Sequence, residues 1–170
     1  MEEYEPNRYL TVDGSEDMIE QTHDTLSDLQ TDCGINVTCS SFKNWTLHPH
    51  DRYDWIFSSL SIHHISDDEK KSLYKQILST LSPGGHFLLC DLFEPPDSLT
   101  DFYRDIYKHR MLNSGYSEEE FEQKWQSHLE NDDPMGFSQT YKLLPKLGFK
   151  DVDLVWKDTT RGIFVGRRSK

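Results

Sequence analysis

The sequence is short of positive charge, and this shortage limits the partners that it fits. Its 170 residues carry 18 Lys and Arg side chains against 30 Asp and Glu side chains, so the formal net charge at pH 7 is −12. Affinity for a nucleic-acid backbone depends on Lys and Arg side chains that release its counterions. The composition therefore disfavours a nucleic-acid partner.

Long apolar runs, a leader sequence and paired cysteines are also missing. No run approaches the ~18 apolar residues that a membrane helix needs, and no signal-peptide pattern is present. Cys33, Cys39 and Cys90 include no C-x-x-C spacing, and unpaired thiols are typical of a reducing compartment. We therefore expect a cytoplasmic protein without a membrane partner.

The apolar pattern predicts alternating strands and helices along one domain, residues 1–170. Strands are expected at 8–13, 35–41, 53–60, 86–93, 149–158 and 160–168, and helices at 16–31, 66–81, 98–112, 117–130 and 138–148. Such alternation is typical of an α/β fold with a mainly parallel sheet, and the last two strands predict a C-terminal antiparallel hairpin.

Three local patterns add detail to this prediction. The run 53–60 is almost wholly apolar, which predicts a strand buried on both faces of the sheet. Ser66 with Glu69, and Ser117 with Glu120, fit capping boxes that start helices. The helices inserted at 99–131 are expected to form a lid, because ligands of such sheets lie outside the carboxyl ends of the parallel strands.

Several motifs occur together in one order: a strand followed by Asp13-x-Ser15-x-x-Met18, then "YDWIFSSLSIHHI", then "LSPGGHFLLCD". In this order the sequence resembles class I S-adenosylmethionine (SAM)-dependent methyltransferases from about Tyr9 to Arg167. The segments "NSGYSEEEFEQKWQSHLEN" and "LLPKLGFKDVDLVWKDTTRGIFVG" are most similar to the carboxy-SAM synthases and related small-molecule methyltransferases. The resemblance implies a Rossmann-like fold with strand order 3-2-1-4-5-7-6. It also implies SAM as cofactor and methyl transfer to a small-molecule acceptor.

The same resemblance implies a set of cofactor-binding residues. Asp13 takes the position of the acid that accepts from both ribose hydroxyls, and the other positions are Gly14, Met18, Ser41, Phe42, Ser58, Ser59 and Leu60. Ser41 stands where the family has an acid beside adenine, and it is a weaker, neutral acceptor. Each position has a structural alternative: a helix N-terminal charge for Asp13, core packing for Met18 and Phe42, and a strand terminus for Ser58–Leu60.

The histidines offer candidates for catalysis. His63 or His64 is a candidate general base, because imidazole titrates near neutral pH, and the alternative is packing under the next helix. We expect no metal site, since His48, His50, His63 and His64 have no Cys or carboxylate at ligand spacing.

A second group of candidates lies in the inserted helices. Tyr103, Arg104, Tyr107 and Arg110 follow one helical stripe, which fits either a pocket for an anionic acceptor or a solvated face with i,i+4 ion pairs. The carboxy-SAM synthases have an arginine that clamps a carboxylate in the segment that corresponds to 131–141. This segment contains no Arg or Lys here, so carboxy-SAM formation is not expected.

The glycine-rich turn that precedes Asp13 in the family has no counterpart in "MEEYEPNR". We therefore expect an N-terminally incomplete fold with an incomplete cofactor site. Three functional classes stay open: a trimmed methyltransferase, a catalytically inactive methyltransferase-like partner, and a small-ligand binding protein. To repair the sheet, either Leu10–Asp13 pairs directly with Trp55–Ser58, or another chain adds a strand and forms an oligomer.

Overall fold

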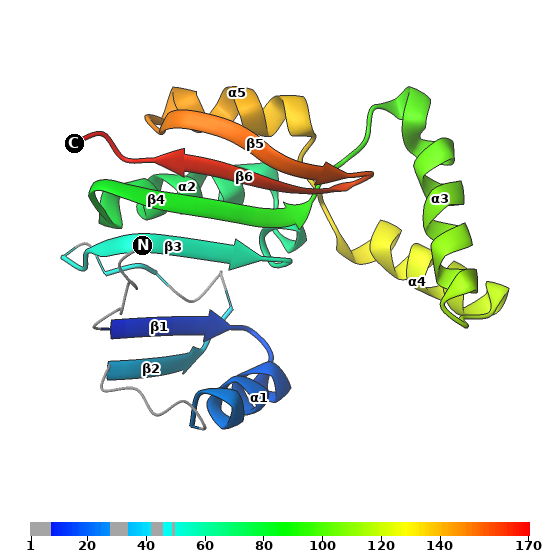
Figure 1. The fold of residues 1–170 in the computed structure, drawn as a ribbon, viewed down its shortest axis with the longest axis horizontal. Coiled ribbons are helices and arrows are strands. Elements are labelled where there is room, and N and C mark those ends of the chain that lie inside the picture. The colour runs from blue at the N-terminus through cyan, green and yellow to red at the C-terminus, as the bar shows by residue number, and fades with distance from the viewer. Residues whose placement is uncertain (1–7, 28–33, 42–45, 49) are drawn as a thin grey trace, which may run out of the picture. The chain divides into compact units, whose positions relative to one another are not determined.

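The computed structural model describes residues 8–27, 34–41, 46–48 and 50–170. Contacts between residues divide the chain into two compact units, Met1–Thr46 and Leu47–Lys170. Each unit has its own sheet (Figure 1). The expectation of one domain over residues 1–170 stays a prediction, as does the role of 99–131 as a lid.

The first unit is a β-α-β segment. Strand β1 (Arg8–Asp13) and strand β2 (Gly34–Cys39) pair in parallel, from Arg8 opposite Gly34 to Asp13 opposite Cys39. Helix α1 (Glu16–Ser27) begins with two acids, which favour the positive end of the helix dipole. The predicted starts of β1 and α1 are confirmed, and β2 begins one residue earlier and ends two residues earlier than predicted. The predicted helix end at Thr31 lies outside the described residues.

The second unit is a mixed sheet with helices. Its elements are β3 (Tyr53–Ser59), η1 (Ile62–His64), α2 (Asp67–Thr80), β4 (Leu81–Leu92), η2 (Asp97–Leu99), α3 (Thr100–Asn113), α4 (Glu118–Asn131), α5 (Phe137–Leu147), β5 (Lys150–Asp158) and β6 (Arg161–Arg167). The strand order is β3-β4-β6-β5, with β3 and β4 parallel and β6 antiparallel to both neighbours. The predicted hairpin is confirmed. In the expected order 3-2-1-4-5-7-6, the sheet β1-β2 corresponds to strands 2 and 3, and the sheet β3-β4-β6-β5 corresponds to strands 4-5-7-6.

Strand β3 is not buried on both faces, so that prediction was wrong. Trp55 is 43% exposed and Phe57 is 68% exposed. Both lie on the sheet face opposite Phe87 and Leu89, which are buried. Tyr74 of α2 contacts Phe87, with 5.9 Å between ring centroids, and α2 also packs against α5. Helix α2 therefore covers the face of the sheet with Phe87, and the apolar run did not reveal that the other face is exposed.

The direct pairing expected between Leu10–Asp13 and Trp55–Ser58 would join the two units, and it stays a prediction. Strand β1 is hydrogen-bonded to β2, and β3 to β4, in two separate sheets. Each of these strands is therefore an edge strand. Whether an added strand from another chain completes either sheet stays a prediction.

The turn at 82–85 belongs to β4 rather than to a connection before it. Strand β4 begins at Leu81 and includes Ser-Pro-Gly-Gly, which was expected to end the helix. Gly84 has φ +82°, and a Cβ on Gly85 would lie 2.9 Å from the Ser82 carbonyl oxygen. Both positions therefore require glycine, so this sequence bends the start of the strand.

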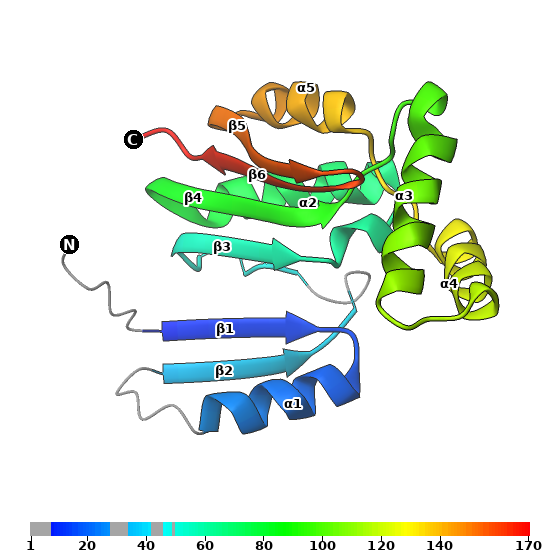
Figure 2. The ribbon, with the colours of Figure 1, turned by 45° about the vertical axis from the view of Figure 1, so that its right-hand side comes forward.

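The core of the second unit lies between the sheet and helices α2 and α5. Its buried aromatic side chains include Tyr74, Phe87, Phe149 and Phe164. Helices α3 and α4 lie beyond the carboxyl ends of β3 and β4 (Figure 1 and Figure 2). This is the edge at which a ligand of a parallel sheet is expected.

Both predicted capping boxes are confirmed. In α4 the Glu120 carboxylate accepts from the Ser117 backbone N–H at 2.7 Å, and the Ser117 Oγ accepts from the Glu120 N–H at 3.2 Å. The backbone hydrogen bond from Ser117, followed by its hydroxyl, lowers the pKa of Glu120. The contribution of this carboxylate to stability is therefore present above its ordinary pKa and is lost as pH falls through the lowered value.

We expect acidification to destabilise the wild-type protein more than the Glu120→Gln variant. Gln also caps at this position but does not titrate, so the variant keeps its cap in acid. Urea unfolding at about pH 6 and about pH 3 measures the difference. Glu119→Gln, one residue away and outside the capping box, is the matched control. Equal losses for the wild-type protein and Glu120→Gln would contradict the prediction.

Candidate functional site

In the first unit, Asp13 lies at the carboxyl end of β1 and starts the turn into α1. Its Oδ1 accepts from the Ser15 backbone N–H at 2.8 Å, and its backbone carbonyl accepts from Ser40 at 2.8 Å. Among the described residues, Oδ2 accepts no hydrogen bond. The carboxylate thus holds the turn with one oxygen and keeps the other available.

Two other predicted cofactor residues lie near Asp13. A Cβ built on Gly14 would lie 3.8 Å from the Ser41 Cα, so Gly14 and Ser41 are neighbours. Met18 is on the first turn of α1 and is 48% exposed, which does not fit the core alternative. Phe42 lies outside the described residues. Asp13, Gly14 and Ser41 therefore lie together in the fold, and Met18 is exposed one helical turn away.

In the second unit, Ser58, Ser59 and Leu60 end strand β3. Ser58 is half-buried, Ser59 is exposed, and Leu60 is 49% exposed with φ +48°. A left-handed conformation is strained for a leucine. It is held by the Leu60 N–H, which donates to the Cys90 carbonyl at 2.9 Å, while the Ser61 Oγ donates to the Ser59 carbonyl at 2.8 Å. The strand thus ends in a constrained turn that leads directly to the two histidines.

His63 is buried and fixed by an acid that the sequence did not single out. Asp91 near the end of β4 is 3% exposed, and its Oδ1 lies 2.5 Å from the His63 Nδ1. The other oxygen of Asp91 accepts from the Ile62 N–H at 2.9 Å. An ionised carboxylate is an acceptor only, so the proton of a neutral imidazole is on Nδ1 and the lone pair is on Nε2.

His64 and His128 both contact a second acid, Asp132, at the end of α4. The His64 Nδ1 lies 2.9 Å from the Asp132 Oδ1, and the His128 Nδ1 lies 2.5 Å from the Asp132 Oδ2. The His63 Nε2 is 3.8 Å from the same Oδ1. Three histidines therefore surround one carboxylate, and the general-base role of His63 or His64 stays a prediction.

A buried lysine connects the same two segments. Lys70 of α2 is 2% exposed, and its ammonium donates to the Ile65 carbonyl at 2.5 Å and to the Asp133 carbonyl. The Asp133 N–H donates to the His63 carbonyl at 2.7 Å. The residues after α4 are thus held against the turn between β3 and α2 by backbone and side-chain hydrogen bonds.

The predicted acceptor stripe on α3 is engaged in contacts within the protein. Arg104 donates twice to Glu122 of α4, at 2.7 and 2.8 Å, and Arg110 donates twice to Asp158 at the end of β5, at 2.6 and 3.0 Å. The hydrogen bond from Arg110 lowers the pKa of Asp158. These ion pairs join α3 to other elements, whereas the alternative expected ion pairs at i,i+4 within the helix. The role of the stripe in substrate binding stays a prediction.

The two tyrosines of the stripe contact the same neighbouring elements. Tyr103 accepts from the Lys157 ammonium at 3.1 Å. Tyr107 packs on Phe121 and Trp125 of α4, with ring centroids 6.0 and 6.4 Å apart. The stripe therefore fastens α3 to α4 and to the end of the β5–β6 hairpin.

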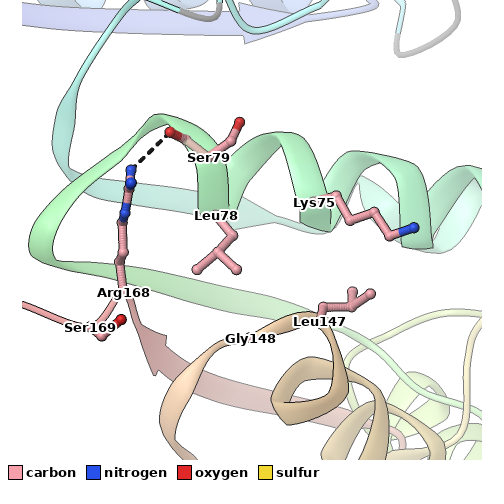
Figure 3. A pocket seen from close by; sticks show the side chains of 7 residues that line it. All are labelled: Lys75, Leu78, Ser79, Leu147, Gly148, Arg168 and Ser169. Atoms are coloured by element: carbon pink, nitrogen blue, oxygen red, sulfur yellow. Dashed lines mark hydrogen bonds between the residues drawn. The ribbon is translucent and has the colours of Figure 1, made fainter.

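A cavity of about 270 Å³ lies away from these residues (Figure 3). It is lined by Lys75, Leu78, Ser79, Leu147, Gly148, Arg168 and Ser169. The Arg168 guanidinium donates to the Ser79 carbonyl at 2.9 Å and the Leu81 carbonyl at 2.6 Å, and so caps the end of α2. Arg168 is thus engaged in the fold, and Lys75 is the second cation among the residues that line the cavity.

No helix among the described residues is long and apolar enough to span a membrane. Cys39 and Cys90 are free thiols.

Comparisons with known proteins agree with the predicted resemblance. The chain is 27% identical over 147 residues to a carboxy-S-adenosyl-L-methionine synthase of Actinobacillus succinogenes, covering 85% of this chain and 59% of that protein. A synthase of the same name from Shewanella halifaxensis is 26% identical over 123 residues, covering 72% of this chain and 49% of that protein. The chain thus spans about half to three-fifths of the length of these relatives.

Solved structures show the fold. Human N-acetylserotonin methyltransferase in complex with SAM has a TM-score of 0.58 and 16% identity, and covers 96% of this chain and 40% of that one. A DhpI–SAH complex has a TM-score of 0.60 and 16% identity, and covers 96% of this chain and 67% of that one. The predicted α/β, Rossmann-like methyltransferase fold is therefore confirmed.

One family match covers the first part of the chain. The family described as "Methyltransferase domain" matches residues 1–85, which span β1 to the start of β4 and include Asp13 and His63. Because these residues make up half of the 170-residue chain, the protein belongs to the methyltransferase domain family.

Proposed function

We propose that this protein binds SAM and transfers its methyl group to a small-molecule acceptor. The observation that carries the proposal is the Asp13 carboxylate at the carboxyl end of β1, in a domain of the methyltransferase family. In Rossmann-like domains an acid that follows a strand accepts hydrogen bonds from ribose hydroxyls. Membership of the family and the names of the relatives support SAM as the ligand.

The residues around Asp13 fit an adenosine group. Oδ1 already accepts from Ser15, which fixes the carboxylate, and Oδ2 accepts no hydrogen bond from the described residues. Gly14 next to it has room for a side chain, since a Cβ there would make only ordinary van der Waals contacts at 3.8 Å and beyond. Ser41, exposed beside Gly14, offers a hydroxyl acceptor for the adenine amino group. Bound SAM would supply an electrophilic methyl group.

We expect Asp13→Ala to weaken SAM binding more than tenfold. Its carboxylate makes charge-assisted hydrogen bonds, whose loss costs on the order of 1.5–3 kcal/mol. Isothermal titration of the full chain with SAM, and with its demethylated product, measures the change. Asp17→Ala is the matched control, because Asp17 is an exposed acid on the first turn of α1. Equal affinities for Asp13→Ala and the wild-type protein would contradict the role of Asp13.

The titration also separates the functional classes. Wild-type binding of SAM supports a methyltransferase. A wild-type protein that binds neither SAM nor its demethylated product would favour a catalytically inactive methyltransferase-like partner. A thermal shift with other small molecules in that case would favour a small-ligand binding protein.

The chemistry of the acceptor follows from charge. A net charge of −12 and the lack of a Lys- or Arg-rich run favour a small molecule over a nucleic acid.

The segment 131–141 has acids, including Asp132 and Asp133, and no Arg or Lys, so it has no cation for a carboxylate substrate. We therefore propose methyl transfer rather than carboxy-SAM formation, and a cytoplasmic location, which the free thiols Cys39 and Cys90 support.

We expect no salt-sensitive binding of RNA to the full chain. Electrostatic binding to a phosphate backbone weakens steeply with salt because counterions are released. Filter binding with transfer RNA at about 50 mM and about 200 mM salt checks this. Submicromolar binding at the lower salt that is lost at the higher salt would overturn the proposal of a small-molecule acceptor.

A further inference from the structure

We propose that His63, His64 and Asp132 form a binding site for a divalent transition-metal ion of the Zn²⁺ type. The three side chains offer one ligand atom each, and these atoms lie within 4.8 Å of one another. They come from the turn after β3 and from the end of α4, both in the second unit. The inference does not depend on the proposed methyl transfer.

The His63 side chain is oriented as a metal ligand is. Its Nδ1 is 2.5 Å from the buried Asp91 carboxylate, which leaves Nε2 as the ligand atom, and Nε2 is 3.8 Å from the Asp132 Oδ1. Metal-binding histidines generally donate their other N–H to a carboxylate or carbonyl, which fixes the tautomer and raises the basicity of the ligand nitrogen. Asp91 supplies this support without binding the ion itself.

The Asp132 carboxylate is supported in the same way. His128 contacts its Oδ2 at 2.5 Å, which leaves Oδ1 on the side of His63 and His64. Asp132 is 10% exposed, and its backbone N–H donates to the His128 carbonyl at 3.1 Å. The His63 imidazole and the Asp132 carboxylate are thus each oriented by a hydrogen bond through the atom that does not bind the ion.

The distances fit a tetrahedral ion. Ligand atoms about 2.0 Å from a tetrahedral Zn²⁺ lie about 3.3 Å from one another. The His64 Nδ1 to Asp132 Oδ1 distance is 2.9 Å, and the His63 Nε2 to Asp132 Oδ1 distance is 3.8 Å. One distance lies below the expected value and one above it, so small side-chain rotations place all three atoms around one ion.

The donor set selects the class of ion. Two imidazoles and one carboxylate suit Zn²⁺ and its neighbours in the first transition series, whereas Mg²⁺ and Ca²⁺ prefer oxygen ligands alone. Three protein ligands leave a fourth tetrahedral position open. The His64 side chain is 53% exposed, so this open position is reachable from solvent.

The test is isothermal titration of the full chain with ZnCl₂, after removal of metal with EDTA. We expect one ion per chain. His64→Gln and Asp132→Asn should each weaken binding at least as much as loss of a supporting hydrogen bond does in known sites, about 10- to 100-fold. These two residues are chosen because His63 is buried, and its replacement would also disturb packing. Circular dichroism checks that each variant is folded.

The double variant His48→Gln/His50→Gln is the matched control. This histidine pair is exposed, with ring centroids 5.6 Å apart, so it offers two imidazoles to adventitious zinc. The control should bind as the wild-type protein does. Visible absorption with Co²⁺ gives a second readout, since tetrahedral nitrogen and oxygen ligands produce intense bands that His64→Gln and Asp132→Asn should both lose.

Three results would overturn the site. They are no binding to the wild-type chain, binding that His64→Gln and Asp132→Asn leave unchanged, and binding that the His48→Gln/His50→Gln control abolishes. Any of them would mean that His63, His64 and Asp132 form a hydrogen-bonded cluster only.

Discussion

Asp91→Ala is expected to lower the free energy of unfolding by about 3–5 kcal/mol. The side chain is 3% exposed and accepts three hydrogen bonds: from the Ile62 N–H at 2.9 Å, from the His63 imidazole at 2.5 Å and from the Leu92 N–H at 2.9 Å. Alanine would leave these donors without a partner in the protein interior, and each buried unsatisfied donor costs about 1–3 kcal/mol.

Urea unfolding in EDTA measures this loss without any contribution from bound metal. Asp158→Ala is the control, because its carboxylate forms a solvent-exposed ion pair with Arg110 and should change stability much less. Asp91→Asn should be intermediate, since its amide oxygen still accepts while its amide nitrogen does not. An unfolding midpoint for Asp91→Ala equal to that of the wild-type protein would show that the three hydrogen bonds contribute nothing net.

The elements of the fold were predictable because their signals are local. The two capping boxes depend on residues three positions apart, and the hairpin of β5 and β6 on alternation within each strand. What failed was the prediction for β3. An apolar run indicates that side chains can be buried, but not whether another layer covers both faces of the strand. Trp55 and Phe57 are exposed on one face, whereas Phe87 on the other face packs against Tyr74 of α2.

The predicted site residues also divide into those that local sequence patterns identified and those that such patterns could not identify. Gly14 and Ser41 are neighbours at the end of β1, and their role with Asp13 in binding SAM stays a prediction. Asp91 and Asp132 were missed, because their importance depends on residues far away in the sequence. The signal available was the acid that ends "HFLLCD", one strand along from the histidine pair, since carboxyl ends of neighbouring parallel strands meet at one edge.

The expectation of no metal site rested on a spacing argument, which considers only residues that are close in the sequence. His63 and His64 have no carboxylate near them in the sequence, yet the end of α4 brings Asp132 to within 2.9 Å of His64. The hydrogen bonds of Lys70 and of the Asp133 N–H hold these two segments together. The lysine thus holds together the two segments that form the cluster, and its pattern in the sequence is that of an ordinary helical lysine.

Lys70→Met is expected to lower the free energy of unfolding by about 2–4 kcal/mol. Methionine keeps most of the volume of the buried side chain, but it leaves the carbonyls of Ile65 and Asp133 without their donor. Lys75→Met, an exposed position on the same helix, is the control and should change stability little.

Hydrogen exchange then separates a loss of local contacts from a loss of general stability. In Lys70→Met the Asp133 amide, which donates to the His63 carbonyl at 2.7 Å, should exchange faster than global unfolding allows. The exchange rate of the Val165 amide, in the middle of the sheet, should change only as far as the global stability changes. If both amides changed by the same factor, Lys70 would stabilise the fold as a whole. If neither changed, the buried ammonium would not connect the end of α4 to the turn after β3.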